Sequence, residues 1–195
     1  QEPEFAEILG SGMAPQPAGH SNSTTSSTAE EKEGSSLSAM ESAIEQEVFG
    51  LEMGYGLLVL ADNKKGGDLL DRITGARTNF AREMGMLLPT IGVRDNIELE
   101  PNEYRFLLRG KEIVRSSIMP DRVLAMSMGG GDASKLNGIP TIEPVFGIKA
   151  MWVPDEERRN AEVEGCTVVD PSSVLVTHLA DVLKREAHLI LEREG

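Results

Sequence analysis

A regular apolar pattern begins at residue 51. Apolar side chains occupy every second position from 51 to 59, which is the period of a half-buried strand. A turn-rich stretch at 62–67 follows, and apolar residues then recur at helical spacing over 68–84. Gly85 stands where helices commonly end in a left-handed residue. The pattern therefore predicts a strand, a loop and an amphipathic helix in that order.

Three short extended segments are expected after this helix. Residues 89–93 have an extended pattern, and 94–96 have the composition of a turn. Two strand-like runs, 104–108 and 112–114, flank Gly110 and predict a β-hairpin. The first half of the folded part thus has the predicted order strand, helix, strand, strand, strand.

The second half alternates strands with helices. We expect strands at 122–126 and 146–153, with a long flexible loop at 129–138 between them. A polar helix is predicted from Pro154 to about Gly165, since proline suits the first turn of a helix. Residues 166–169 then predict a buried strand.

A long amphipathic helix is predicted to close the chain. Asp170 is a good N-cap residue, and Pro171 suits the first helical position. The apolar repeat continues almost to the last residue, so we interpret the sequence as part of a longer chain. The whole pattern predicts an α/β fold, a mixed sheet flanked by helices, which is thioredoxin-like or ferredoxin-like in its first part. The pattern does not choose between those two.

The first 50 residues differ from the rest in charge and composition. They carry nine acidic residues and one lysine, a net charge of −8 out of −13 for the chain. Ten of the twenty residues at 21–40 are Ser or Thr. Such a segment has too little apolar surface to offset its ordering entropy, so we expect 1–39 to be a disordered linker. A short helix is expected from Ser38 to Val48.

Overall charge and cysteine content exclude several classes of protein. A net charge of −13 and a pI near 4.7 argue against nucleic-acid binding and against a polybasic membrane-surface module. The single cysteine, Cys166, allows no internal disulfide and fits a reducing compartment. No apolar run approaches the roughly 20 residues of a membrane span, and the first residues lack a signal-peptide pattern.

The sequence shows no convergent catalytic pattern. The glycine-rich stretches lack the Lys-Ser/Thr of a phosphate-binding loop. His178 and Asp181 are one helical turn apart, which favours a surface pair, and Cys166 is expected in the core. A small α/β enzyme would require a pocket that joins Asp95, His178 and an acidic partner. We therefore expect no enzyme activity and no nucleotide, metal or other cofactor.

Seven motifs, taken together and in order, resemble one known family. They are LEMGYGL at 51–57, GGDLLDRI at 66–73, RDN at 94–96, PNEYR at 101–105, EPVFG at 143–147, TVVDP at 167–171 and THL at 177–179. In this order they resemble the flagellar biosynthesis and type III secretion export-gate family (FHIPEP). The surroundings of RDN are closer to the flagellar branch than to the virulence branch.

The resemblance implies a domain organisation. It makes 1–50 the linker after a membrane-spanning half. Residues 51–120 with 171–190 would form the first cytoplasmic subdomain, 121–170 an inserted second subdomain, and 191–195 the start of a third. The full-length protein would lie in the bacterial inner membrane, with this part on the cytoplasmic face and assembled into a nonameric ring.

The resemblance also implies a function and candidate site residues. Family members dock export chaperone–substrate complexes and work with other export apparatus proteins, including an ATPase complex. The positions that match the chaperone-binding dimple are Glu143, Phe146, Val169, Val174 and Thr177.

Several of these expectations carry an alternative, and Val169 and Val174 also suit simple core packing. Glu143 stands where Asp is frequent in the family, so it keeps the charge with a longer reach. Phe146 suits an interface anchor or simple core packing. Gly54 matches a position where close packing or hinge motion matters, and the alternative is a tight strand crossing. The alternative function is a structural ring component whose chaperone sites lie in the missing subdomains.

Overall fold

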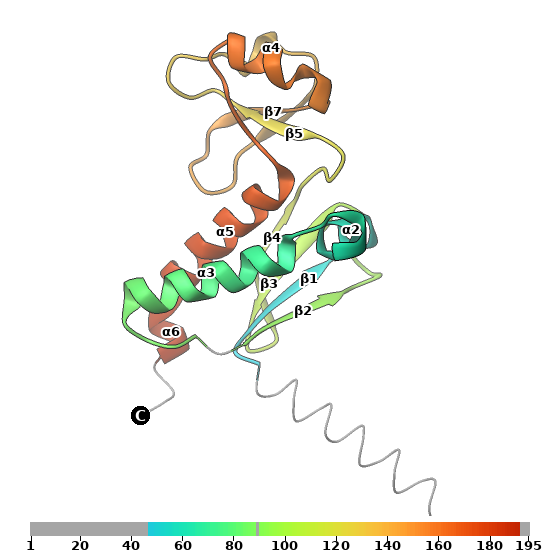
Figure 1. Cartoon of the computed structure of the whole chain (residues 1–195). Helices are drawn as coiled ribbons and strands as arrows, with labels where there is room; N and C mark the ends of the chain where they lie inside the picture. Colours follow the sequence, from blue (N-terminus) through green and yellow to red (C-terminus); the bar gives the residue numbers. More distant parts are fainter. Residues whose placement is uncertain (1–46, 89, 192–195) are drawn as a thin grey trace, which may run out of the picture. The chain divides into compact units, whose positions relative to one another are not determined.

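Two four-stranded sheets and a set of helices make up the described part of the chain (Figure 1). In this computed structural model, residues 47–88 and 90–191 are described. The predicted α/β class is confirmed. The predicted linker at 1–39, and most of the short helix expected from Ser38, lie outside the described residues.

The first sheet is mixed, with the strand order β2-β1-β3-β4. Strand β1 (Phe49–Met53) pairs in parallel with β2 (Ile91–Asp95) and antiparallel with β3 (Glu103–Leu108). The edge strand β4 (Lys111–Ser117) pairs antiparallel with β3, as the predicted hairpin requires.

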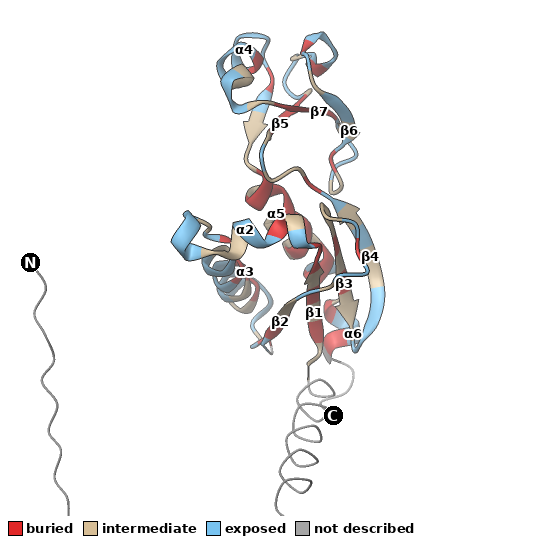
Figure 2. Cartoon of the chain, turned by 90° about the vertical axis from the view of Figure 1, so that its right-hand side faces the viewer, coloured by how far each residue is buried: buried red, intermediate tan, exposed pale blue. Residues whose placement is uncertain are grey.

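Two long helices pack beside each other against the first sheet. Helix α3 (Leu69–Met84) confirms the predicted amphipathic helix, and Gly85 ends it in the left-handed region. Helix α5 (Pro171–Arg185) contacts α3, and α6 (Ala187–Leu191) follows it. Buried residues gather on β1, β3 and α5 (Figure 2), where they form one apolar core.

The second sheet is antiparallel, with the order β6-β7-β5-β8. Its strands are β5 (Val123–Met126), β6 (Ile139–Ile142), β7 (Lys149–Val153) and β8 (Thr167–Val169). Helix α4 (Arg158–Val163) contacts β5 and β8 and helps to enclose a smaller core. A short 3-10 helix, η4 (Asp155–Glu157), precedes α4, so the predicted helix after Pro154 is confirmed in two pieces.

The predicted strand from 51 to 59 is wrong in its second half. Strand β1 ends at Met53, and the chain continues as a 3-10 helix, η1 (Tyr55–Leu57), and a short helix, α2 (Leu58–Ala61). Gly54 marks the change, since a Cβ there would collide with the backbone of Glu100 and Pro101. The apolar alternation continues past Gly54, but the strand conformation ends at Met53.

Three features of the second half also differ from prediction. The strand expected from Phe146 begins only at Lys149, because Gly147 adopts a left-handed turn conformation. Strand β6 was missed, since a proline interrupts its short apolar run at a sheet edge. The loop at 129–138 contains a 3-10 helix, η3 (Ala133–Lys135), and two side chains buried in the smaller core, Ala133 and Leu136.

Three further predictions need correction. Arg94 and Asp95 belong to β2 and not to a turn. Cys166 is buried as expected but precedes β8, and Thr167, the first residue of β8, is exposed. The closing helix is interrupted at Glu186 between α5 and α6.

The remaining short element is η2 (Asn63–Lys65), capped by the Asp62 side chain within the predicted loop. Among residues 47–88 and 90–191, the helices fall short of the length and apolarity that a bilayer span needs.

Candidate docking pocket

The five predicted docking residues line a single pocket between the second sheet and the start of α5. The pocket has a volume of about 270 Å³. Glu143 and Phe146 come from the turn after β6, Val169 from the end of β8, and Val174 and Thr177 from α5. Folding therefore brings together residues that are up to 34 positions apart in sequence (177 minus 143).

Glu143 shapes the turn that carries Phe146. Its side chain is 3% exposed, and its carboxylate accepts hydrogen bonds from the backbone N–H groups of Val145 (3.0 Å) and Phe146 (2.6 Å). The N–H of Gly147 donates to the Glu143 carbonyl at 3.0 Å, and the positive φ of Gly147 closes the turn. A buried carboxylate needs such donors, so this side chain fixes the backbone of the turn.

Phe146 stands at the rim of the pocket with 68% of its surface exposed. The alternative that Phe146 is a core residue is therefore wrong. A large aromatic side chain held in solvent by a tight turn leaves apolar area available for a partner. The exposed Met128 side chain also lines the pocket.

The start of α5 forms the opposite wall. Val174 is buried, Val169 is half-buried and Thr177 is exposed. Asp170 occupies the N-cap position, but its side chain does not cap the backbone. It accepts a hydrogen bond from the Ser173 hydroxyl at 2.5 Å instead.

Arg72 of α3 ties this part of α5 to the neighbouring helix. Its guanidinium donates to Ser173 at 2.6 Å and forms an ion pair with Asp170 at 3.2 Å. The first turn of α5, and with it the pocket wall, is therefore anchored by polar contacts.

Four further lining residues were not predicted: Met126, Met128, Thr167 and Ser173. Ser173 lies one helical turn before Thr177, so helical spacing from Thr177 would have indicated it. Met126 and Thr167 carry no comparable signal, because the pairing of β5 with β8 places them side by side, and Met128 lies in the loop after β5.

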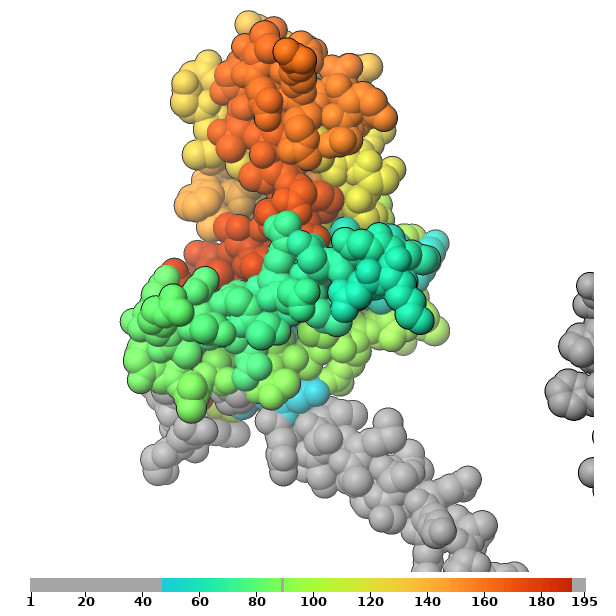
Figure 3. Space-filling model, in the orientation of Figure 1, coloured from blue at the N-terminus to red at the C-terminus, as the bar shows by residue number. Residues whose placement is uncertain are grey.

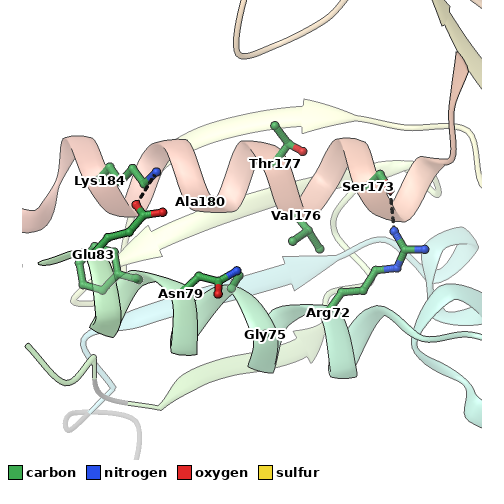
Figure 4. Close-up of a pocket in the computed structure, with 11 residues that line it drawn as sticks. Arg72, Gly75, Asn79, Glu83, Ser173, Val176, Thr177, Ala180 and Lys184 are labelled. Carbon is green, nitrogen blue, oxygen red and sulfur yellow. Dashed lines mark hydrogen bonds and ion pairs between the residues drawn. The ribbon is translucent and has the colours of Figure 1, made fainter. Parts of the chain in front are cut away.

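A second and larger groove lies between α3 and α5, with a volume of about 420 Å³ (Figure 4). Small residues, Gly75 and Ala180, hold it open. An Arg72–Ser173 hydrogen bond and a Glu83–Lys184 ion pair of 2.7 Å cross it (Figure 4). In the space-filling view, α3 and α5 lie next to each other on one face (Figure 3). Sequence analysis did not predict this groove, since neither helix alone indicates its neighbour.

His178 is not the surface residue that helical spacing predicted. It is 3% exposed, and its Nδ1 lies 2.6 Å from the hydroxyl oxygen of Tyr104 on β3. The imidazole also meets the rings of Tyr104 and Phe106 edge-on, at centroid distances of 5.7 and 5.2 Å. Asp181 pairs with Arg185 at 2.9 Å, not with His178.

Burial governs the protonation of this pair. It lowers the pKa of His178 below the ordinary imidazole value and raises the pKa of the Tyr104 phenol. The neutral forms of both groups are therefore favoured. Asp95 is exposed at the end of β2, whereas His178 is buried in the core against Tyr104.

Gly54 lies where two backbone segments meet. Its N–H donates to the Glu103 carbonyl at 2.8 Å, and a Cβ would lie 2.7 Å from the Pro101 carbonyl oxygen. Its φ of −65° is one that any residue adopts, so space and not conformation requires glycine. Gly54 therefore marks a close approach between the end of β1 and the backbone at Glu100 and Pro101.

Residues 47–88 and 90–191 contain no group of three or more His, Cys, Asp or Glu side chains placed to hold a metal ion. Cys166 is buried, and burial raises the pKa of its thiol.

Solved structures share this arrangement of sheets. The CdsV protein of Chlamydia pneumoniae matches with a TM-score of 0.60 and 25% sequence identity, over 73% of this chain and 43% of CdsV. A cytoplasmic domain of Salmonella InvA matches with a TM-score of 0.53 over 76% of this chain and 90% of that domain. At 17% identity the InvA likeness shows a common fold. The chain thus has the two-sheet α/β fold that CdsV and the InvA cytoplasmic domain also have.

The chain belongs to the FHIPEP family, whose sequence model matches residues 7–195. The flagellar biosynthesis protein FlhA of Bacillus subtilis (strain 168) is 44% identical over 143 residues, which are 73% of this chain and 21% of that protein. FlhA of Helicobacter pylori (strain J99) is 38% identical over 175 residues, which are 90% of this chain and 24% of that protein. The chain spans about a fifth to a quarter of the length of these relatives.

Proposed function

We propose that this chain is part of a flagellar protein-export gate and that the pocket between the second sheet and α5 docks export chaperone–substrate complexes. The family and the FlhA relatives support the export role. The observation that carries the docking role is the convergence of Glu143, Phe146, Val169, Val174 and Thr177 on one pocket.

The physical character of the pocket suits protein docking. Its lining is mainly apolar, with an exposed aromatic ring at the rim and a buried carboxylate that fixes the turn beneath it. Aromatic anchors that become desolvated dominate the energetics of many interfaces. Met128 adds exposed, flexible apolar surface, which adapts to partners of different shape, and the buried Met126 lies beneath it in the lining.

The place of this chain in the whole protein is part of the same proposal. Residues 51–120 with 171–190 would be the first cytoplasmic subdomain and 121–170 the inserted second, with 191–195 entering a third. The return of α5 to the core of the first sheet after the second sheet supports this division. The full-length protein would sit in the inner membrane, expose this part to the cytoplasm, form a nonameric ring and meet the export ATPase complex.

Calorimetric titration with a flagellar chaperone–substrate complex tests the docking role. The 195-residue chain should bind, and Phe146→Ala and Thr177→Ala should each weaken binding. Truncation of an interface anchor typically costs about 2 kcal/mol or more, which is roughly a 30-fold change in Kd. Because both side chains are exposed, circular dichroism and thermal unfolding of the variants should match the wild type.

Ile97→Ala serves as the matched control. Ile97 is an apolar residue that is 88% exposed and lies outside the pocket lining, so its removal should leave affinity unchanged. A folded wild-type chain that shows no binding would contradict the docking role. It would favour a ring component whose chaperone sites lie in other subdomains, which predicts self-association without chaperone affinity.

A further inference from the structure

A buried hydrogen bond lies directly behind the wall of the docking pocket. It joins the Tyr104 hydroxyl on β3 to Nδ1 of His178 on α5, 74 residues away, at 2.6 Å. Tyr104 is fully buried and His178 is 3% exposed. Most of the packing of α5 on the first sheet is apolar, so this bond is a directional contact within that packing.

The position of His178 connects this bond to the pocket. His178 follows Thr177 directly and lies one helical turn after Val174, and both of these residues line the pocket. Glu143, on the opposite side of the pocket, lies close enough for its charge to raise the pKa of both Tyr104 and His178. His178 therefore adjoins the helix wall of the pocket in sequence, and the charge of Glu143 acts on both members of the pair.

We propose that the Tyr104–His178 hydrogen bond positions the α5 wall of the docking pocket and that protonation of His178 weakens docking. The inference rests on the proposed function, because it concerns the same pocket. It assigns Tyr104 and His178 as positioning residues that act without touching the partner.

The chemistry of the pair explains the expected pH dependence. In neutral imidazole one ring nitrogen accepts, so the Tyr104 O–H donates to Nδ1 when Nε2 carries the proton. A second proton on the ring removes this acceptor and places a positive charge in the core. The bond would then have to reverse or break, and the adjoining turn of α5 would shift with it.

The charged groups around His178 come from three elements. Arg185 of α5 lowers the pKa of His178, whereas Asp181 of α5 and Glu143 of the turn raise it. From β3, the facing titratable group is Tyr104 itself, which stays neutral. Burial is the largest influence, so the net pKa of His178 lies below its ordinary value and the titration falls on the acid side of neutrality.

Two substitutions separate the effect of the hydrogen bond from the effect of His178 protonation. Tyr104→Phe removes only the hydroxyl and leaves the rings in place. His178→Gln removes the titrating group but keeps an amide oxygen that is able to accept from Tyr104. Ile91→Val is the control, because Ile91 is buried in the same core on β2, away from the pocket lining.

The first measurement is the affinity of the 195-residue chain for a chaperone–substrate complex between pH 5 and pH 8. Wild-type affinity should fall on the acid side, and His178→Gln should retain affinity with a flat profile across that step. Tyr104→Phe should weaken docking at pH 7.5 by roughly 2- to 30-fold, the range seen for residues that couple to a site without touching the ligand. Ile91→Val should keep the wild-type affinity and profile. A His178→Gln profile identical to that of the wild type, or unchanged affinity in Tyr104→Phe, would overturn the inference.

The second measurement needs no partner and separates this inference from the proposed function. Methyl NMR resonances of Val174 and Thr177 should move as His178 titrates and should be displaced in Tyr104→Phe but not in Ile91→Val. If these shifts occur and the wild type binds no complex, the positioning role stands and the docking role fails. Methyl resonances that shift neither in Tyr104→Phe nor during the titration would refute the positioning role, even if docking is real. Should His178→Gln fail to fold, Tyr104→Phe alone decides between these outcomes.

Discussion

Replacing Gly54 by alanine tests the close backbone approach that ends β1. A Cβ at this position would lie 2.7 Å from the Pro101 carbonyl oxygen and still nearer to the carbonyl oxygen of Glu100. Both neighbours are backbone atoms, so no flexible side chain is able to move aside. The backbone dihedrals of Gly54, φ −65° and ψ 157°, suit alanine, so the collision alone opposes the substitution.

The expected cost follows from the nature of the collision. Inserting a methyl group into a well-packed site costs about 1–3 kcal/mol, and a rigid neighbour places this site at the upper end, near 3 kcal/mol. The lower backbone entropy of unfolded alanine returns only about 0.4–1 kcal/mol. The net cost is about 2–2.6 kcal/mol, so at roughly 2–4 °C per kcal/mol for a chain of this size Gly54→Ala should lower the Tm by about 4–10 °C.

Gly75→Ala is the matched control for this experiment. Gly75 lies inside α3, and beyond the backbone of its own helix no atom lies within 4 Å of the place that a Cβ would take. The same substitution therefore meets open space. Alanine is favoured over glycine in a helix interior by roughly 0.5–1 kcal/mol, so the control should raise the Tm. Thermal unfolding followed by circular dichroism measures both variants. Equal stability of Gly54→Ala and the wild type would refute the close approach.

Three further measurements probe other parts of the molecule. The folded-state pKa of His178 lies below its unfolded value, so the His178 contribution to stability is fully present above about pH 6.5 and is lost as the pH falls below that value. Urea unfolding at pH 7.5 and 5.5 should show this loss of stability, and the loss should be smaller in His178→Gln. The Cys166 thiol should react slowly with a thiol reagent at pH 8 in the folded chain and rapidly in urea, since it is buried with a raised pKa; equal rates would contradict its burial. Arg72→Met should lower the free energy of unfolding in urea by about 0.5–1 kcal/mol, because Arg72 forms partly exposed ion pairs with Asp68 and Asp170. The loss should be smaller in high salt, and a loss that does not depend on salt would indicate packing instead.

Local signals in the sequence were reliable where they acted within one element. The apolar spacing over 68–84 and the glycine after it predicted α3 to within a residue, and Gly110 predicted the β3–β4 hairpin. Asp170 and Pro171 marked the start of α5. In each case, neighbouring residues alone supply the spacing, the turn conformation or the first helical turn.

The failures occurred where distant segments decide the outcome. The apolar alternation through Val59 predicted a strand, but β1 ends before Gly54, where the backbone of Glu100 and Pro101 leaves no room for a Cβ and a 3-10 helix follows. Helical spacing placed His178 beside Asp181 on the surface, but packing of α5 on the first sheet buries it against Tyr104. Periodicity does not say which face of a helix meets which strand.

The candidate pocket also shows which features the sequence indicates and which ones depend on the tertiary structure. Resemblance to a family named Glu143, Phe146, Val169, Val174 and Thr177 as positions of one dimple, whereas no local pattern in the sequence connects these five residues. The sequence by itself determined the α/β class, the amphipathic helices and the acidic character of the first 50 residues, because composition and spacing express these directly. The tertiary structure alone decided that Phe146 is exposed, that Glu143 supports its turn and that Tyr104 bonds to His178. These features depend on contacts between segments that are far apart in the chain, and no local pattern encodes them.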